Sequence, residues 1–492
     1  MKKNIFLSFA LAATFFVSAQ QKNTLLEASL WKTKPEVNTI KDEISKGNNP
    51  AEANVNAFDV TTLAINNDAP LATIKFLLDQ PGNPVTKMTH DNRIYLHWAA
   101  YRGNVELVEY LIAKGSDINL EDSHGTTPLV FAASNGQSDP ALYEAFFKAG
   151  IDPKKKYKDG ENLLLLGIPS DKELKLADFL TTKGLSLKDV DNNGNTAFNY
   201  AARTGDIALL KKLLERKVEY TDNALLIATQ GSRRESTSLE AYKFLVEDLK
   251  LKPTVTGKSG ENVLHLLAGK PNQKEIINYF LSKGIDVNKV NNDGNTPYMI
   301  AAGARENGAL ELLLPKAKNI NLQNKKGESA LTMAVKSGTT EAVLLLLGRG
   351  ADVKVIDKDG NNLGVYLVQL YRPESKQDTF EAKVKLLQDK GLNLAAPQKD
   401  GSTLYHFAAA KNDLSLVKKL ASLNIDVNTK NKDGITALHK AAMVAKDDTI
   451  LKYLLSIGAK KEITTEFDES AYALAKENES LTKQNISIEF LK

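Results

Sequence analysis

Residues 291–305 read NNDGNTPYMIAAGAR, and this pattern recurs along the chain. Its first four residues favour a tight turn, because glycine accepts positive φ angles and Asn and Asp tolerate them. Thr296 then stands where a helix is capped, with Pro297 at the first helical position. The following pair of alanines keeps one helix face thin, so that a neighbouring helix can approach closely. Four more stretches share the pattern: DSHGTTPLVFAASNG (122–136), DNNGNTAFNYAARTG (191–205), NKKGESALTMAVKSG (324–338) and NKDGITALHKAAMVA (431–445).

The turn glycine returns at nearly constant intervals of 35, 34, 66, 34, 33, 33, 41 and 33 residues. A period of about 33 residues indicates one structural unit repeated many times. Each unit also contains a second stretch with helical apolar periodicity, such as ELVEYLIAKG at 106–115. We therefore expect each unit to be a hairpin turn, a helix, a turn and a second helix. The glycines expected just past the second helix, in the left-handed C′ position, are Gly115, Gly150, Gly184, Gly284, Gly350, Gly391 and Gly458.

These units resemble the ankyrin repeat, which has a period of about 33 residues and the signature T-P-L-H-x-A. The resemblance implies an all-α repeat solenoid, a curved stack of units that each hold a hairpin turn and two antiparallel helices. About thirteen units fit between residues 24 and 464. The clearest matches are IYLHWAA (94–100), TTPLVFAA (126–133), NVLHLLA (262–268) and ITALHKAA (435–442).

Departures from the repeat suggest how the chain is organised. The stretch 223–256 lacks the Asp-x-x-Gly turn and carries the polar run QGSRREST, so it is a candidate flexible joint. The insertion LYRPESKQDTF at 370–380 explains the 41-residue interval. The expected segments are a signal peptide (1–19), a degenerate N-terminal capping repeat (20–56), ankyrin repeats (57–222), a degenerate repeat (223–256), ankyrin repeats (257–464) and a C-terminal capping helix with a tail (465–492).

The first nineteen residues predict export. Lys2 and Lys3 form a charged start, residues 5–17 are apolar, and Val17-Ser18-Ala19 is a small-residue cleavage site. The alternative is a membrane anchor, but this apolar run is shorter than the roughly 20 residues that span a bilayer. The chain has no cysteine, which excludes a lipid-anchored lipoprotein and any disulfide. We expect an exported protein without membrane insertion after cleavage, in the periplasm first and outside the cell second.

Charge and motifs bear on partners and chemistry. The formal net charge of +4 becomes +2 without Lys2 and Lys3, which argues against nucleic acid or an anionic surface as the main partner. The chain has no G-x-S-x-G elbow, no P-loop and no G-x-G-x-x-G motif. Its carboxylates stand mainly at turn positions. We therefore expect no enzyme, no catalytic residue and no cofactor, and a monomer that binds another protein.

The six histidines divide into two groups. His97, His265, His406 and His439 occupy the histidine slot of the repeat, where the resemblance implies a structural hydrogen-bonding residue. Because slot histidines lie in different units, they do not converge on one metal ion, and no metal site is expected. His90 and His124 lie in neighbouring hairpin turns, where they are either surface ligands or solvated turn residues.

The ankyrin resemblance implies a concave binding face made of the first helices and the hairpin tips. Protein interfaces favour aromatic residues and arginine, which gather near the start of this array. Trp98 is one of only two tryptophans in the chain. The alternative is that these bulky side chains only pack one repeat against the next, and the sequence leaves both open. The candidate protein-binding residues are His90, Arg93, Trp98, Tyr101, Arg102, His124, Phe131, Tyr200 and Arg203.

The function that the sequence favours is an exported scaffold that binds another protein through this concave face, in the periplasm. A secreted effector that targets a host or competitor protein is the alternative within the binding class. A hydrolase-type enzyme built around His90, Asp91 and His124 is the alternative from another class. A purely architectural spacer is the third.

Overall fold

The computed structural model describes residues 22–232, 236–372 and 379–492. The predicted signal peptide lies outside these residues. The described part of the chain is helical and contains no β-strand, which confirms the all-α prediction. Its extended pairing is limited to isolated β-bridges, between Ala53 and Asp59, Val190 and Thr196, and Thr464 and Ser470.

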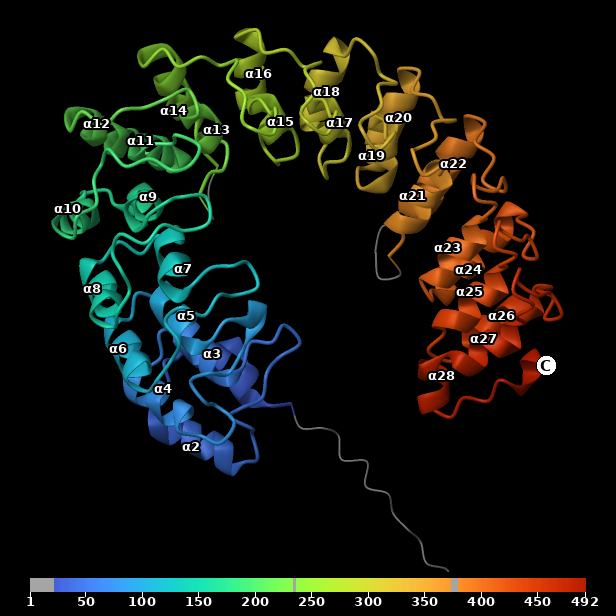
Figure 1. Cartoon of the computed structure of the whole chain (residues 1–492), viewed down its shortest axis with the longest axis horizontal. Coiled ribbons are helices and arrows are strands. Elements are labelled where there is room, and N and C mark those ends of the chain that lie inside the picture. Colours follow the sequence, from blue (N-terminus) through green and yellow to red (C-terminus); the bar gives the residue numbers. More distant parts are fainter. Residues whose placement is uncertain (1–21, 233–235, 373–378) are drawn as a thin grey trace, which may run out of the picture. The chain divides into compact units, whose positions relative to one another are not determined.

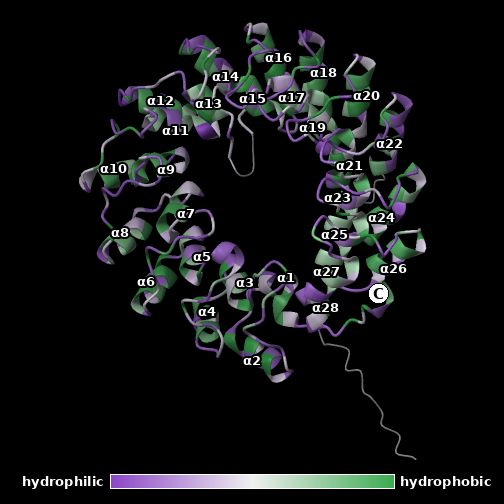
Figure 2. Ribbon diagram, turned by 45° about the vertical axis from the view of Figure 1, so that its right-hand side comes forward, coloured by the Kyte–Doolittle hydropathy of each residue, from purple (hydrophilic) through white to green (hydrophobic). Residues whose placement is uncertain are grey.

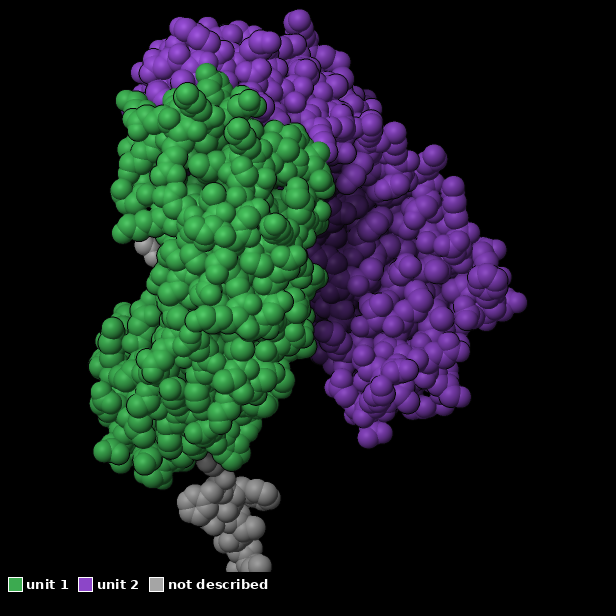
Figure 3. All heavy atoms as spheres, turned by 60° about the vertical axis from the view of Figure 1, so that its left-hand side comes forward, with its two compact units in different colours: residues 1–201, 208–220 green, residues 202–207, 221–492 purple. Residues whose placement is uncertain are grey.

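The chain divides into two compact units (Figure 3). Unit 1 consists of residues 1–201 and 208–220, and unit 2 consists of residues 202–207 and 221–492. The division falls directly before the predicted degenerate repeat at 223–256. The role of that repeat as a flexible joint stays a prediction.

In unit 1 the helices follow one another as antiparallel pairs (Figure 1). The first helix of each pair packs on the first helix of the next pair, as α3, α5 and α7 do, and α6 packs on α8 in the same way. The helices are α1 (Ala28–Lys32), α2 (Val37–Ser45), α3 (Val60–Asn66), α4 (Leu71–Leu78), α5 (Tyr95–Tyr101), α6 (Val105–Ala113), α7 (Pro128–Ser134), α8 (Pro140–Lys148), α9 (Leu163–Gly167), α10 (Lys175–Thr182), α11 (Ala197–Ala201) and, but for its first residue, α12 (Ile207–Glu215).

Unit 2 repeats this arrangement. Helix α14 continues as a π-helical turn over Phe244–Asp248, within the degenerate repeat. The helices are α13 (Ala224–Ala228), α14 (Leu239–Lys243), α15 (Val263–Ala268), α16 (Lys274–Ser282), α17 (Pro297–Ala302), α18 (Gly308–Leu313), α19 (Ala330–Lys336), α20 (Thr340–Gly348), α21 (Leu363–Leu370), α22 (Thr379–Asp389), α23 (Leu404–Ala410), α24 (Leu414–Leu420), α25 (Ala437–Val444), α26 (Thr449–Ser456), α27 (Ala471–Glu477) and α28 (Glu479–Lys483).

The C-terminal segment 465–492 is more regular than its sequence suggests. It contains the two short helices α27 and α28, and α27 packs on α25 as the first helix of a further repeat would. The backbone amide of Glu466 donates to the carbonyl of Asp433 at 3.1 Å, which ties this segment to the preceding hairpin.

The local sequence signals lie where the repeat pattern places them. Thr127, Thr296, Ser329 and Thr436 each directly precede a helix. All seven glycines predicted for the C′ position have positive φ angles. Hydrophobic residues lie mainly on the helices, while the connecting loops are mainly hydrophilic (Figure 2). Caps, turns and apolar periodicity therefore agree in this fold.

Backbone hydrogen bonds join successive hairpin tips. The amide of Lys325 donates to Asp293 O at 2.8 Å, and the amide of Lys358 donates to Lys326 O at 2.9 Å. Gly327 lies between these two bonds with a φ of +79°, and a Cβ atom there would lie 2.7 Å from the amide nitrogen of Lys358. Glycine is therefore required both by the turn and by the approach of the next tip.

Candidate protein-binding surface

The slot histidines tie each helix to the next hairpin. The Nδ1 atom of His406 accepts a hydrogen bond from the Thr403 amide at 2.9 Å, so Nε2 carries the proton and donates to Ile435 O at 2.9 Å. His439 makes the same pair of bonds, with the Thr436 amide and Ile463 O. Burial is the main cause that lowers the pKa of both imidazoles. These histidines are structural, as the resemblance implies.

His97 is the exception within this slot. It is fully buried, and its Nε2 contacts Thr126 O at 3.2 Å. The residue that caps its helix is Ile94, whose side chain has no polar atom to meet Nδ1, unlike that of Thr403 or Thr436. The Nδ1 atom is consequently buried without a hydrogen-bond partner. Burial lowers the pKa of His97 to about 4.

The hairpin tips bring the two remaining histidines to one carboxylate. The Nε2 atoms of His90 and His124 each lie 3.3 Å from Asp91 Oδ2, and Arg93 Nη1 lies 3.0 Å from the same oxygen. The His124 side chain is 62% exposed and that of His90 is 39% exposed. Among the residues that the structure describes, no group of three or more His, Cys, Asp or Glu side chains is arranged so that it could hold a metal ion. The cluster presents two imidazoles to solvent around an arginine–aspartate pair.

The aromatic residues behind these tips are buried. Trp98 is 5% exposed, and its indole nitrogen donates to Thr89 Oγ1 at 2.8 Å. Phe131 is 8% exposed and meets the Trp98 ring edge-on at a centroid distance of 5.9 Å. The Arg93 guanidinium lies over Phe131 at 4.1 Å and bonds to Asp122 Oδ2 at 2.8 Å. In this geometry Arg93, Trp98 and Phe131 join one repeat to the next and keep little exposed surface, and their direct contact with a partner stays a prediction.

The same cluster lowers the pKa of Asp122. Burial alone would raise it, but hydrogen bonds from the backbone and hydroxyl of Thr126, the His124 amide and the Arg93 side chain favour the charged carboxylate more strongly. The ionised carboxylate therefore holds the Arg93 guanidinium against the rings, and the cluster gives a rigid base to the hairpin tips.

Phe58 and Thr89 also belong to this cluster, but they could not be recognised from the sequence. Phe58 stacks on the His90 ring at 4.5 Å and lies 5.5 Å from the Trp98 ring, but it stands at the start of the predicted repeats (57–222), in a turn that lacks the signature glycine. Thr89 occupies the turn position that holds Asp in other repeats, which hides its bond to Trp98. Contacts between repeats decide these roles, and a single repeat does not display them.

The exposed side of this region is smaller than the predicted set. Tyr101 and Arg102 end helix α5 and are half-buried. Tyr101 lies 5.3 Å from the Phe131 ring, and Arg102 Nε donates to Asp68 Oδ1 at 2.9 Å. We use the name N-terminal patch for His90, Tyr101, Arg102 and His124.

The two remaining candidates lie in different units. Tyr200, in unit 1, is half-buried, and its hydroxyl donates to Asp191 Oδ2 at 2.9 Å. Tyr366 makes the same bond to Asp357 in unit 2, at 2.7 Å. Arg203 is counted with unit 2 and is half-buried, and burial lowers its pKa. The tyrosine in this slot therefore ties its helix to its own turn.

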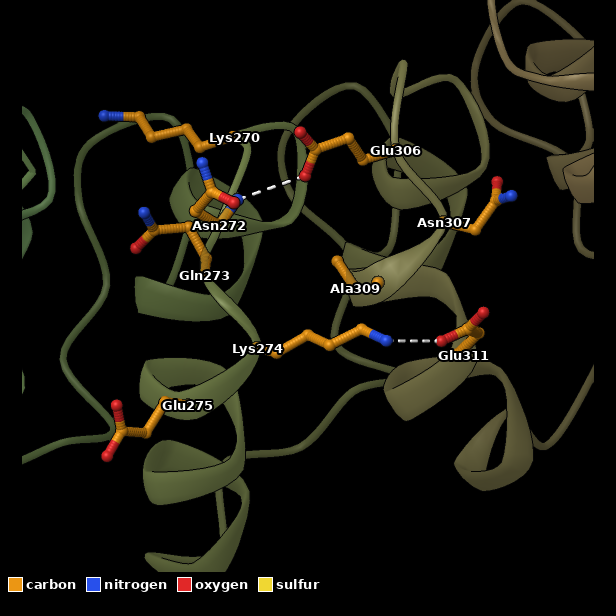
Figure 4. A pocket seen from close by; sticks show the side chains of 10 residues that line it. Lys270, Asn272, Gln273, Lys274, Glu275, Glu306, Asn307, Ala309 and Glu311 are labelled. Atoms are coloured by element: carbon orange, nitrogen blue, oxygen red, sulfur yellow. Dashed lines mark hydrogen bonds and ion pairs between the residues drawn. The ribbon is translucent and has the colours of Figure 1, made fainter.

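Unit 2 contains a polar hollow of about 640 Å³ where the turns between paired helices meet (Figure 4). The amide of Asn272 donates to Glu306 at 3.1 Å across it, and Lys274 pairs with Glu311 at 2.7 Å. A second hollow of about 760 Å³ lies beside it and shares Asn307. Lys270 donates to the carbonyl of Thr229, and the described lining of the first hollow offers no arrangement of nucleophile and base.

The helices in the described residues are all too short or too polar to cross a membrane. Comparison with curated proteins finds partial matches. The chain is 32% identical over 154 residues to the palmitoyltransferase AKR1 of Lachancea kluyveri, covering 30% of this chain and 20% of that protein. It is 25% identical over 403 residues to the human transient receptor potential cation channel subfamily A member 1, covering 79% of this chain and 32% of the channel. A putative ankyrin repeat protein of Rickettsia bellii is 24% identical over 301 residues, covering 59% of this chain and 41% of that protein.

The chain thus spans less than half the length of these relatives. Among solved structures, the ankyrin repeat domain of Bcl-3 matches with a TM-score of 0.34 and 21% identity, covering 46% of this chain and all of that domain. The family model described as "Ankyrin repeats (3 copies)" matches residues 62–157, 225–323, 264–357 and 376–465, which is more than half of the chain. The chain belongs to the ankyrin-repeat family.

Proposed function

We propose that this ankyrin-repeat protein is a non-catalytic scaffold that binds another protein through the N-terminal patch of unit 1. The observation that carries the proposal is the contrast in burial within one cluster. Arg93, Trp98 and Phe131 are buried and fixed, while the patch residues stand at the surface on top of them. A rigid base lowers the entropy that exposed side chains lose on binding. Tyrosine and arginine are also residue types that carry binding energy at interfaces.

A pull-down from the source organism's envelope fraction tests this proposal. The test variant is Tyr101→Ala/Arg102→Ala, at the end of helix α5. Its matched control is Tyr110→Ala/Lys114→Ala on helix α6 and its C-cap, which removes an aromatic and a cation from the outer side of the same repeat. We expect the control to retain a partner that the test variant loses. Equal retention by both variants would place the binding site elsewhere on the array.

We further propose that the protein is exported, in the periplasm rather than the medium. The support is the charged, apolar and small-residue pattern of residues 1–19. Cell fractionation and N-terminal sequencing of the purified protein test this. A mature chain that begins at Gln20 in the periplasmic fraction is the expected result. Recovery from the medium would favour the secreted effector, and an uncleaved chain in the cytoplasm would contradict export.

A further inference from the structure

A hairpin of unit 1 carries the sequence Lys154-Lys155-Lys156-Tyr157-Lys158, with four lysines in five residues. Three of these lysines are exposed, and Lys155 is half-buried. The run lies between helices α8 and α9, so it belongs to a hairpin beyond the N-terminal patch. We use the name basic strip for these four lysines.

Side chains of the basic strip contact the hairpins on both sides of it. Lys155 Nζ lies 3.3 Å from Asn119 Oδ1 in the preceding hairpin, and Lys156 Nζ lies 3.4 Å from Val190 O in the following one. Lys154 lies against Gly184 at the end of α10, where an added Cβ would come within 2.8 Å of its Nζ. The positive charge therefore extends across three successive hairpins.

The acidic residues nearby accept hydrogen bonds from local backbone amides. Asp152 accepts the Lys154 amide at 2.9 Å, and Glu161 accepts the Asp159 amide at 2.6 Å. Asp189 accepts the Ser186 amide at 2.9 Å. Each carboxylate is thus directed to local donors. Within the described part of the chain, none of the four lysines takes part in an ion pair.

Other lysines of the array are used differently. On the second helices, Lys183 pairs with Glu144 and Lys274 pairs with Glu311. At three hairpin tips of unit 2, a lysine is followed directly by an aspartate, in Lys358-Asp359, Lys399-Asp400 and Lys432-Asp433. Neighbouring charges of opposite sign give little net field, whereas Lys154, Lys155 and Lys156 follow one another with no acidic residue between them and attract anions.

We propose that the basic strip is a second binding site, which takes an extended acidic segment of a partner protein. This inference rests on the proposed protein-binding function. One observation favours a polypeptide over a polyanion such as nucleic acid. Val190, which is 42% exposed, lies beside Lys156 and offers an apolar contact that an amino-acid chain can use.

The test is the binding of a short, labelled polyglutamate peptide to the full chain, measured by fluorescence anisotropy at low salt. The strip variant is Lys155→Glu/Lys156→Glu/Lys158→Glu. The matched control is Lys358→Glu/Lys399→Glu/Lys432→Glu, which reverses the same number of charges at hairpin tips of unit 2. We expect the strip variant to bind about tenfold more weakly and the control to bind like wild type. Circular dichroism of both variants checks that they fold.

Each other outcome overturns the proposal. Absence of polyglutamate binding to wild type, or equal weakening in both variants, would show that the strip is no specific site. Competition by duplex DNA or by phosphatidylserine vesicles as strong as that by polyglutamate would assign the strip to polyanions in general. Polyglutamate binding tests the basic strip alone, because the peptide replaces the natural partner. The N-terminal patch is tested separately by Tyr101→Ala/Arg102→Ala, which is expected to leave polyglutamate binding unchanged.

Discussion

At the scale of single residues, burial decides what a side chain does in this array. The sequence places His97 in the histidine slot of one unit and His124 in the hairpin turn of the next. His97 is fully buried and bonded across the repeat boundary, whereas the His124 side chain is 62% exposed. The histidine slot could be recognised from the sequence because the T-P-L-H register marks it. The burial of Trp98 could not, because it depends on Phe58 and Phe131 from other repeats.

The buried imidazole of His97 predicts that stability falls in acid. Its pKa of about 4 in the folded chain lies below the ordinary value of about 6.5, so the unfolded chain binds the proton more readily. The contribution of neutral His97 to the free energy of unfolding is therefore fully present above pH of about 6.5 and is lost as pH falls through about 4. The loss amounts to about 3 kcal/mol. Urea unfolding of wild type and His97→Gln across this range measures it. A variant with the same acid sensitivity as wild type would contradict the assignment.

Burial also separates two kinds of aromatic residue. We expect Trp98→Ala to lower the free energy of unfolding of unit 1 by about 3–5 kcal/mol, because it opens a cavity between repeats. Tyr101→Ala/Arg102→Ala is expected to cost less than half as much, since both residues are half-buried. Thermal unfolding of the two variants, followed by far-ultraviolet circular dichroism, compares these losses. Equal losses would contradict the division between base and surface.

At the scale of elements, helix ends depend on side chains from the following repeat. Lys383, on α22, is fully buried, and its Nζ donates to the carbonyls of Ala334 at 2.8 Å, Val335 at 3.1 Å and Gly338 at 2.7 Å. It therefore caps the C-terminal end of α19. Lys411 does the same for α21, through Val368 O at 2.9 Å and Tyr371 O at 3.1 Å. The turn glycines and N-caps could be predicted from local sequence, but these caps could not, because donor and acceptor are 40 to 49 residues apart.

Lys383→Met is accordingly expected to destabilise unit 2 by about 2 kcal/mol, since it leaves buried carbonyls without their charged donor. The matched control is Lys385→Met on the same helix, where the side chain is 78% exposed and pairs only with Asp389. That change is expected to stay within about 0.5 kcal/mol of wild type. Chemical denaturation of both variants provides the comparison, and similar stability in the two would refute the capping role.

At the scale of the whole molecule, an array of repeats transmits changes only to its neighbours. The fold class followed from the 33-residue period, because every unit needs the next one to bury its apolar face. The division at residues 201–221 was not visible in the sequence, where the only sign was the missing turn at 223–256. The helix pair of the C-terminal segment was also missed, since Thr465-Glu466-Phe467-Asp468 replaces the usual Asp-x-x-Gly turn.

This local coupling predicts a confined response to mutation. Hydrogen exchange of Trp98→Ala should accelerate in α3, α5 and α7, which pack on one another, and stay unchanged in α19–α25 of unit 2. Exchange measured by mass spectrometry resolves these helices. Acceleration throughout the chain would contradict nearest-neighbour stability.

Site-specific photo-crosslinking in the source organism tests whether the N-terminal patch contacts a partner protein. A photoreactive amino acid replaces Tyr101 in one strain and Tyr110, on the outer helix of the same repeat, in another. We expect one discrete protein adduct from position 101 that is absent from position 110. Adducts of equal yield from both positions, or an adduct from position 110 alone, would contradict it.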